Sequence, residues 1–149
     1  LFSNHITRGI DGTVSSALGM AVAQKAGNNF LFIGDISFFY DLNAFHILRN
    51  GKINLNIIVI NNNGGQIFSR LPYSNDNIKE FNKYWITPLE TSIVEACSLF
   101  KLNYLKSTIE EIGSNLKKAI AKKGINVIEV SIDNKNDMSF IKKISNKIN

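Results

Sequence analysis

One stretch decides the fold, residues 30–65, which read FLFIGDISFFYDLNAFHILRNGKINLNIIVINNNGG. It holds two mostly apolar runs, residues 30–33 and 55–60, and each is soon followed by a side chain with an oxygen ligand, Asp35 and Asn62. Such runs are typical of parallel strands that are covered on both faces. Because the carboxyl ends of neighbouring parallel strands lie side by side, we expect Asp35 and Asn62 to converge at one edge of the sheet.

The groups expected at this edge suit a hard cation. A carboxylate, an amide oxygen and a backbone carbonyl beside glycine are all oxygen ligands, which Mg²⁺ prefers. Magnesium commonly takes few ligands from the protein and the rest from water and phosphate oxygens. We therefore predict that Asp35 and Asn62 bind a cation that holds a diphosphate.

The pair Asn63-Gly64 is also compatible with a tight hairpin turn, which is the structural alternative for this run. Against it, residues 66–70 are a poor antiparallel partner, and residues 55–60 have the pattern of a buried strand. The context favours a loop that binds the metal.

The remaining chain alternates between helices and strands. We expect further strands at residues 103–106 and 126–132, and helices at residues 13–26, 37–50, 92–101, 108–123 and 138–148. The expected helix caps are Asp11 or Thr13, Ser37, and Ser92 with Glu95, with Gly27 as the stop of the first helix. Residues 69–90 contain both prolines and are expected to form a long loop over a site. This order predicts one doubly wound α/β domain with a mostly parallel sheet over residues 1–149.

Composition argues against several classes of protein. The net charge of +5 arises after residue 100, from scattered lysines without interleaved aromatic residues, so we expect no nucleic-acid partner. No apolar stretch is long enough for a membrane span. The single cysteine, Cys97, lies among helix-spaced apolar residues, where packing is the expected role, and it fits a reducing cytoplasm. The chain lacks an initiator Met, so we expect it to be part of a longer protein.

Three segments together resemble a known enzyme family. They are residues 9–12 (GIDG), residues 34–43 (GDISFFYDLN) and residues 61–72 (NNNGGQIFSRLP). The spacing between Gly34-Asp35 and the asparagine pair resembles the thiamine diphosphate motif. The full set is similar to 2-succinyl-5-enolpyruvyl-6-hydroxy-3-cyclohexene-1-carboxylate synthase, a transferase of menaquinone biosynthesis. The resemblance covers nearly the whole chain but only the last part of that enzyme.

The resemblance implies a site for thiamine diphosphate and Mg²⁺, with Mn²⁺ as a possible replacement. The implied metal ligands are Asp35, Asn62 and the carbonyl of Gly64. The implied cofactor contacts are Gly34, Asp35, Ile36, Ser37, Asn62 and, as the apolar support of the bent cofactor, Ile10. An ordinary buried isoleucine remains the alternative for Ile10.

The resemblance also implies a substrate pocket, to which Ile67 and Phe68 contribute. The family has an arginine for a substrate carboxylate where this chain has His5, and a neutral imidazole is a weaker anion ligand than a guanidinium. Arg8 is a candidate replacement, and a surface role is its alternative.

The implied reaction is decarboxylation of 2-oxoglutarate followed by addition to isochorismate, with the bond-making carried by the cofactor. The activating glutamate is expected on an N-terminal pyrimidine-binding domain, in a homodimer or homotetramer, so the isolated chain is expected to be inactive. Two alternatives stay open: another thiamine diphosphate-dependent decarboxylase, such as an acetolactate synthase relative, and a noncatalytic α/β interaction module.

Overall fold

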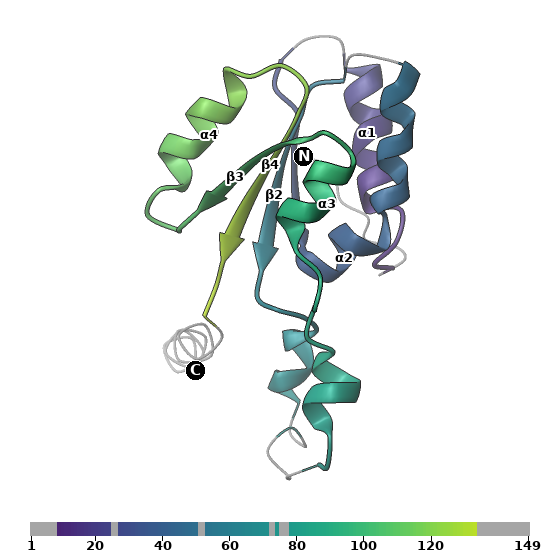
Figure 1. The fold of residues 1–149 in the computed structure, drawn as a ribbon, viewed down its shortest axis with the longest axis vertical. Coiled ribbons are helices and arrows are strands. Elements are labelled where there is room, and N and C mark those ends of the chain that lie inside the picture. Colours follow the sequence, from purple (N-terminus) through teal and green to yellow (C-terminus); the bar gives the residue numbers. More distant parts are fainter. Residues whose placement is uncertain (1–8, 25–26, 51–52, 72–73, 75–77, 134–149) are drawn as a thin grey trace, which may run out of the picture.

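A wholly parallel sheet lies at the centre of the computed structural model, which describes residues 9–24, 27–50, 53–71, 74 and 78–133. Its strands, in sheet order, are β1 (Phe30–Gly34), β2 (Leu55–Asn61), β4 (Ile125–Ser131) and β3 (Asn103–Ser107). Figure 1 shows β2, β3 and β4 running in one direction, with their carboxyl ends toward the bottom of the view, and β1 pairs parallel to β2. The α/β fold with a parallel sheet, predicted from the sequence, is confirmed.

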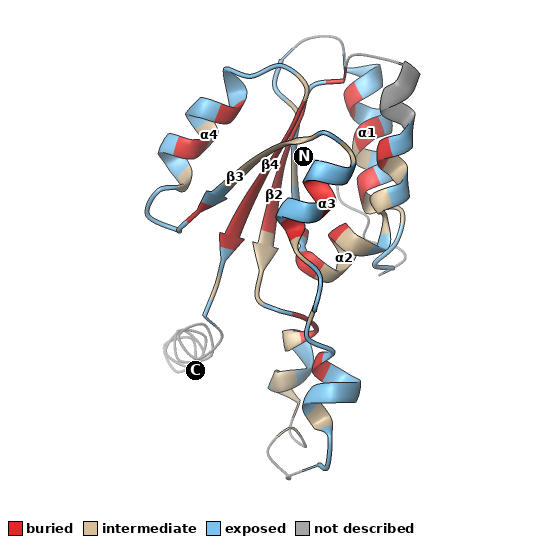
Figure 2. Ribbon diagram, in the orientation of Figure 1, coloured by how far each residue is buried: buried red, intermediate tan, exposed pale blue. Residues whose placement is uncertain are grey.

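Helices cover both faces of the sheet. One face carries α1 (Thr13–Ala23), α2 (Asp35–Tyr40), η1 (Leu42–Asn50) and α3 (Ile93–Leu99). The other carries α4 (Ile112–Ile120), which packs on β2, β3 and β4. The central strands β2 and β4 are buried along most of their length and are mostly red in Figure 2, although the arrowhead of β2 is tan. The run at residues 55–60 became the central strand β2, which is covered on both faces as predicted. The run at residues 30–33 became the edge strand β1, in which Phe30 and Phe32 are exposed, so its predicted coverage on both faces was wrong.

The order of the strands reverses once along the chain. The chain passes from β1 to its neighbour β2, crosses over β4 to reach β3, and then returns to β4. Right-handed crossovers that reverse direction must place their helices on opposite faces, which is where α3 and α4 are found. In open sheets of this kind, ligands bind outside the carboxyl ends of the strands.

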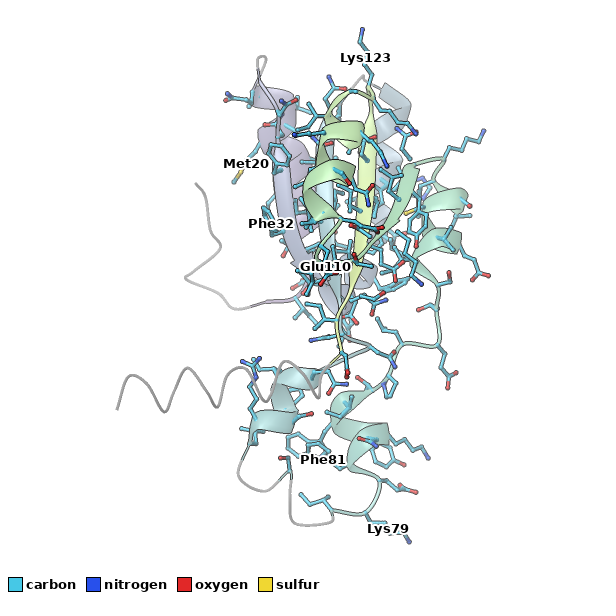
Figure 3. The ribbon with its side chains drawn as sticks, turned by 90° about the vertical axis from the view of Figure 1, so that its left-hand side faces the viewer. Met20, Phe32, Lys79, Phe81, Glu110 and Lys123 are labelled. Atoms are coloured by element: carbon cyan, nitrogen blue, oxygen red, sulfur yellow. The ribbon has the colours of Figure 1, made fainter. Side chains whose placement is uncertain are left out.

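A helical projection extends from that carboxyl edge, seen in teal at the bottom of Figure 1. It contains η2 (Gln66–Arg70) and a short π-helix, η4 (Asn82–Ile86). The Trp85 ring stacks on Phe81 with centroids 6.0 Å apart and meets Phe68 edge-on at 5.6 Å. Figure 3 shows Phe81 inside the projection, well below the sheet. The expectation of a plain loop at residues 69–90 was wrong in its described part, because these aromatic rings pack together and order short helices.

Several predicted helix boundaries were also wrong. The helix expected from Ser37 begins at Asp35 and breaks at Asp41, so Ser37 lies inside the first turn and does not cap it. The helix expected over 108–123 spans only Ile112–Ile120, because Thr108 Oγ1 accepts a hydrogen bond from the Glu111 amide and forms a separate turn.

The first helix ends at Ala23, before the expected stop at Gly27, since Gln24 has extended backbone. The predicted cap of α3 is confirmed: Ser92 Oγ accepts a hydrogen bond from the Glu95 amide. The helix expected at residues 138–148 lies outside the described residues. Among the described residues, none of the helices is both long and apolar enough to cross a membrane.

Candidate functional site

Asp35 joins the two halves of the predicted site. It follows β1 directly and is only 2 % exposed. Its Oδ2 accepts a hydrogen bond from the Gly64 amide at 2.8 Å, and its Oδ1 accepts one from the Ile36 amide at 2.9 Å. The first of these bonds spans 29 residues of sequence and ties the end of β1 to the loop after β2.

Asn62 lies in that loop, half-buried, directly after β2. The register pairs Gly34 with Ile60, so the segments after β1 and β2 leave the sheet as neighbours, about 4.8 Å apart. Asn62 is two residues before the amide that binds Asp35. The sheet therefore brings the Asp35 and Asn62 segments to one edge.

The loop after β2 is held in shape by Asn61, the last residue of the strand, and by Asn63 within the loop. Asn61 Oδ1 accepts a hydrogen bond from the Asn63 amide at 3.0 Å, which closes an Asx turn. Asn63 has a left-handed backbone, with φ of 61°, and its Oδ1 accepts a bond from the Leu89 amide at 3.2 Å. A hairpin does not form here, since β2 has parallel partners on both sides, β1 and β4.

The two glycines of this loop pack directly on the main chain of residues 85–88. The Gly65 amide donates to the Ile86 carbonyl at 2.6 Å. A Cβ added to Gly64 would collide with that same carbonyl oxygen and would lie 2.9 Å from the carbonyl oxygen of Thr87. Gly64 also has φ of 110°, which L side chains rarely adopt. The loop therefore requires glycine at this position.

Asp41, just after α2, anchors the start of α1. Its two carboxylate oxygens accept hydrogen bonds from the Ser15 amide at 2.6 Å and the Ser15 hydroxyl at 2.8 Å. These bonds cap α1 from a distant part of the chain, whereas the predicted caps, Asp11 and Thr13, are wrong: the capping position is Gly12, which has no side chain to accept a bond. Asp41 thereby fixes the first turn of α1, which follows the bend that contains Ile10.

A pocket of about 460 Å³ opens between the body of the domain, formed by the sheet and its helices, and the helical projection. Its lining is largely apolar and aromatic, and consists of Ile10, Ile36, Tyr40, Gly65, Phe68, Tyr84, Trp85, Thr87 and Leu89. Trp85 both lines this pocket and holds the projection together through its ring contacts. The pocket lies beside the loop that binds Asp35, since Gly65 of that loop is part of its lining. A ligand in the pocket would therefore also contact the loop.

The other predicted site residues are placed as follows. Phe68 lines the pocket, whereas its neighbour Ile67 is 69 % exposed and lies outside the lining. Gly34 is exposed, and a Cβ added to it would meet no atom within 4 Å. Ser37 is half-buried in the first turn of α2. The substrate-binding candidates His5 and Arg8 lie outside the described residues.

The chain matches, over residues 3–130, the family described as thiamine pyrophosphate enzyme, C-terminal TPP binding domain. The chain belongs to this family. Three curated relatives carry the name 2-succinyl-5-enolpyruvyl-6-hydroxy-3-cyclohexene-1-carboxylate synthase. They come from Rippkaea orientalis (36 % identical over 99 % of this chain), Listeria monocytogenes serotype 4b (37 % over 87 %) and Desulfitobacterium hafniense (38 % over 89 %). The chain spans 24 %, 22 % and 24 % of their respective lengths.

For a TPP-binding domain, the donor set at the sheet edge is the informative feature. The described residues contain no group of three or more His, Cys, Asp or Glu side chains that would hold a metal. The residues predicted for a cation at this edge supply the carboxylate of Asp35 together with amide and carbonyl oxygens. Such a sparse oxygen set fits Mg²⁺, which completes its octahedron with phosphate and water oxygens.

A second polar group of the TPP-binding domain lies behind the loop. Glu129 in β4 accepts hydrogen bonds from Asn61 Nδ2 at 2.7 Å and from the Tyr104 hydroxyl at 2.6 Å. The pKa of Tyr104 is raised by burial, by this hydrogen bond and by the charge of Glu129. Burial, with a smaller effect of Glu129, also raises the pKa of Cys97 to about 12. Cys97 is thus a buried, protonated packing residue, as its helical spacing predicts.

Sequence reasoning missed three of these roles. Asp41, Asn61 and Glu129 bond to partners 26, 2 and 68 residues away. The short-range Asx turn of Asn61 had a sequence signal, because asparagine side chains favour a bond to the backbone two residues on. The other two contacts depend on which strands and helices become neighbours, and no local pattern encodes them.

Proposed function

We propose that this chain is the diphosphate- and Mg²⁺-binding domain of a 2-succinyl-5-enolpyruvyl-6-hydroxy-3-cyclohexene-1-carboxylate synthase. The intact enzyme would decarboxylate 2-oxoglutarate and add the resulting four-carbon unit to isochorismate, in menaquinone biosynthesis. The observation that carries the proposal is the bond between Asp35 and the Gly64 amide, which unites the two halves of the motif. The names of the relatives support the choice of reaction.

In this proposal Asp35, Asn62 and the Gly64 carbonyl hold the cation. Each oxygen of the Asp35 carboxylate accepts one backbone hydrogen bond and keeps a further lone pair for a metal. The Gly64 carbonyl accepts the Gln66 amide at 2.8 Å and likewise keeps one lone pair. The carboxylate is therefore fixed by the main chain before a cation arrives.

The diphosphate would lie over Gly34, with Ser37 as a hydroxyl donor. The space around Gly34 supports this, since no atom of the described chain occupies the volume that a side chain there would take. The Ile36 amide already donates to Asp35, so its part in the proposal is to fix that carboxylate. Ile36 also lines the pocket, so its assignment as a cofactor contact stays part of the proposal.

The pocket would hold the reactive end of the cofactor. Thiamine diphosphate supplies the carbanion chemistry when bound, and the protein supplies orientation and exclusion of water. Ile10 and Phe68 both line the pocket, and Phe68 belongs to the projection whereas Ile10 precedes α1. A pyrimidine-binding domain, in a homodimer or homotetramer, would complete the site.

The test is calorimetric titration of the full-length protein with thiamine diphosphate, with and without Mg²⁺. We expect Mg²⁺-dependent binding that is at least about tenfold weaker in Asp35→Asn, since the amide cannot replace a charged metal ligand. Glu110→Gln makes the same change of group at an exposed position and should bind like the wild type. Absence of Mg²⁺-dependent binding in the wild type would refute the proposal.

The substrate class is tested separately. We expect the full-length protein to release carbon dioxide from 2-oxoglutarate, and to do so much faster than from pyruvate. A clear preference for pyruvate would assign the chain to another branch of thiamine diphosphate enzymes.

A further inference from the structure

Glu129 is a buried carboxylate that the proposed chemistry does not use. It is 8 % exposed, on the α3 side of the sheet. In the described part of the chain, both of its hydrogen bonds come from neutral side chains, Asn61 on β2 and Tyr104 on β3. Burying a carboxylate without a positive partner is costly, so its presence calls for a specific role.

That role follows from what a carboxylate can do to an asparagine. An ionised carboxylate only accepts hydrogen bonds, so Asn61 must turn its Nδ2 toward Glu129. The Asn61 Oδ1 is then left facing the loop, where it accepts the Asn63 amide. If the Asn61 side-chain amide were flipped, its Nδ2 would face the Asn63 amide, and two donors would oppose each other. The hydrogen bond to Glu129 excludes this flipped orientation.

The orientation of Asn61 has consequences for the whole loop. The Asx turn that it closes gives Asn63 its left-handed backbone and leads directly to the Gly64 amide that binds Asp35. Asn62 lies within this turn, between the bonding atoms of Asn61 and Asn63. The direction of the Asn62 side chain and of the Gly64 carbonyl is therefore set by a turn that Asn61 holds.

We propose that Glu129 is a positioning residue for the cation-binding loop, acting through Asn61. The inference rests on the proposed function, because it concerns the loop assigned to Mg²⁺. Glu129 does not contact the cation in this proposal. It selects the one orientation of Asn61 that keeps the loop in its cation-binding shape.

Tyr104 provides a matched control. Its hydroxyl bonds the other oxygen of Glu129, on the side away from Asn61. Tyr104→Phe thus removes one of the two hydrogen bonds to Glu129 and leaves the link to the loop in place. If Glu129 had only a structural role, losing the bond to Tyr104 and losing the bond to Asn61 should change the Mg²⁺ affinity to the same extent.

The experiment measures the Mg²⁺ affinity of the full-length protein by calorimetry at saturating thiamine diphosphate, together with Tm in the absence of both ligands. A glutamine at position 129 can offer either an oxygen or an amide group to Asn61, so it no longer enforces one orientation. We expect Glu129→Gln to weaken Mg²⁺ about tenfold or more, the range found for outer contacts of metal ligands. Tyr104→Phe should stay within about twofold of the wild type, and Asn61→Ala should match Glu129→Gln.

The double variant Glu129→Gln/Asn61→Ala should be no weaker than Asn61→Ala, because both changes break the same link. Wild-type Mg²⁺ affinity in Glu129→Gln, or equal losses in Tyr104→Phe and Glu129→Gln, would overturn this inference alone. If Glu129→Gln does not fold, Asn61→Ala carries the test, and a wild-type affinity in that variant is equally fatal. Failure of the wild type to bind, or wild-type binding in Asp35→Asn, would instead overturn the proposed function and this inference with it.

Discussion

Replacing Gly64 by alanine tests whether the loop after β2 is packed on the projection as described. Two separate effects oppose this change. The backbone φ of 110° disfavours any L side chain, at a cost of about 1–2 kcal/mol. The new Cβ would also meet the Ile86 carbonyl and lie 2.9 Å from the Thr87 carbonyl oxygen, and overpacking of this kind costs about 1–3 kcal/mol.

Together these effects predict a loss of about 2–5 kcal/mol in the free energy of unfolding, a large part of the roughly 5–15 kcal/mol of a typical domain. For a chain of this size Tm should fall by about 2–4 °C per kcal/mol. The contacted atoms are main-chain carbonyls, so no rotamer change can relieve the collision.

The assay is urea denaturation without cofactor or metal, so that any loss reflects packing alone. Gly113→Ala is the control, since Gly113 lies exposed in α4 and a Cβ there meets nothing within 4 Å. That variant should gain roughly 0.5–1 kcal/mol from helix propensity. If Gly64→Ala were as stable as the wild type, the loop would not lie against residues 86–87, and the geometry argued for the cation site would be wrong.

Three further predictions concern other parts of the molecule. Asp41→Ala should lower the free energy of unfolding by about 0.5–2 kcal/mol in denaturation, since α1 loses its cap. Cys97 should be alkylated by iodoacetamide at pH 8 roughly a thousandfold more slowly in the native than in the unfolded protein, because raising the thiol pKa from 9.0 to about 12 removes most thiolate. Because Cys97 and Tyr104 both have raised pKa values, the native state retains protons that the unfolded state loses. Stability should therefore fall as pH rises from about 9 toward 12. Tyr104→Phe should make the free energy of unfolding, measured by denaturation at each pH, fall less steeply over this range. An unchanged dependence on pH would contradict the raised pKa assigned to Tyr104.

The strands β1 and β2 were predictable because both are apolar runs, although only β2 is buried on both faces and Phe30 and Phe32 of β1 are exposed. The runs at residues 30–33 and 55–60 became β1 and β2 within a residue, and their parallel pairing followed from the helical segment between them. Helix ends were less predictable. Ser37 is a good cap by type, yet the buried Asp35 bonds its neighbour's amide and starts the helix two residues earlier.

The position of Asp35 at a sheet edge was also predictable, since it depends only on strand order and direction. Its bond to Gly64 confirms that the two segments meet. The pocket was less predictable from the sequence. Tyr84 and Trp85 line it only because the projection folds back toward Ile10. That fold-back rests on ring contacts and on main-chain bonds to glycines, which a sequence pattern does not reveal.

The three asparagines at the end of β2 and just after it have different contacts. Asn61 turns its amide to Glu129 and its oxygen to the loop, and Asn63 bonds the chain entering α3 through the Leu89 amide. Both shape the loop from either side of Asn62, the residue to which our proposal assigns the cation. Asn61 and Asn63 thus have different tasks, set by the groups that each side chain bonds. A motif match identifies the group as a whole, whereas the task of each member depends on residues as distant as Glu129, 68 positions from Asn61.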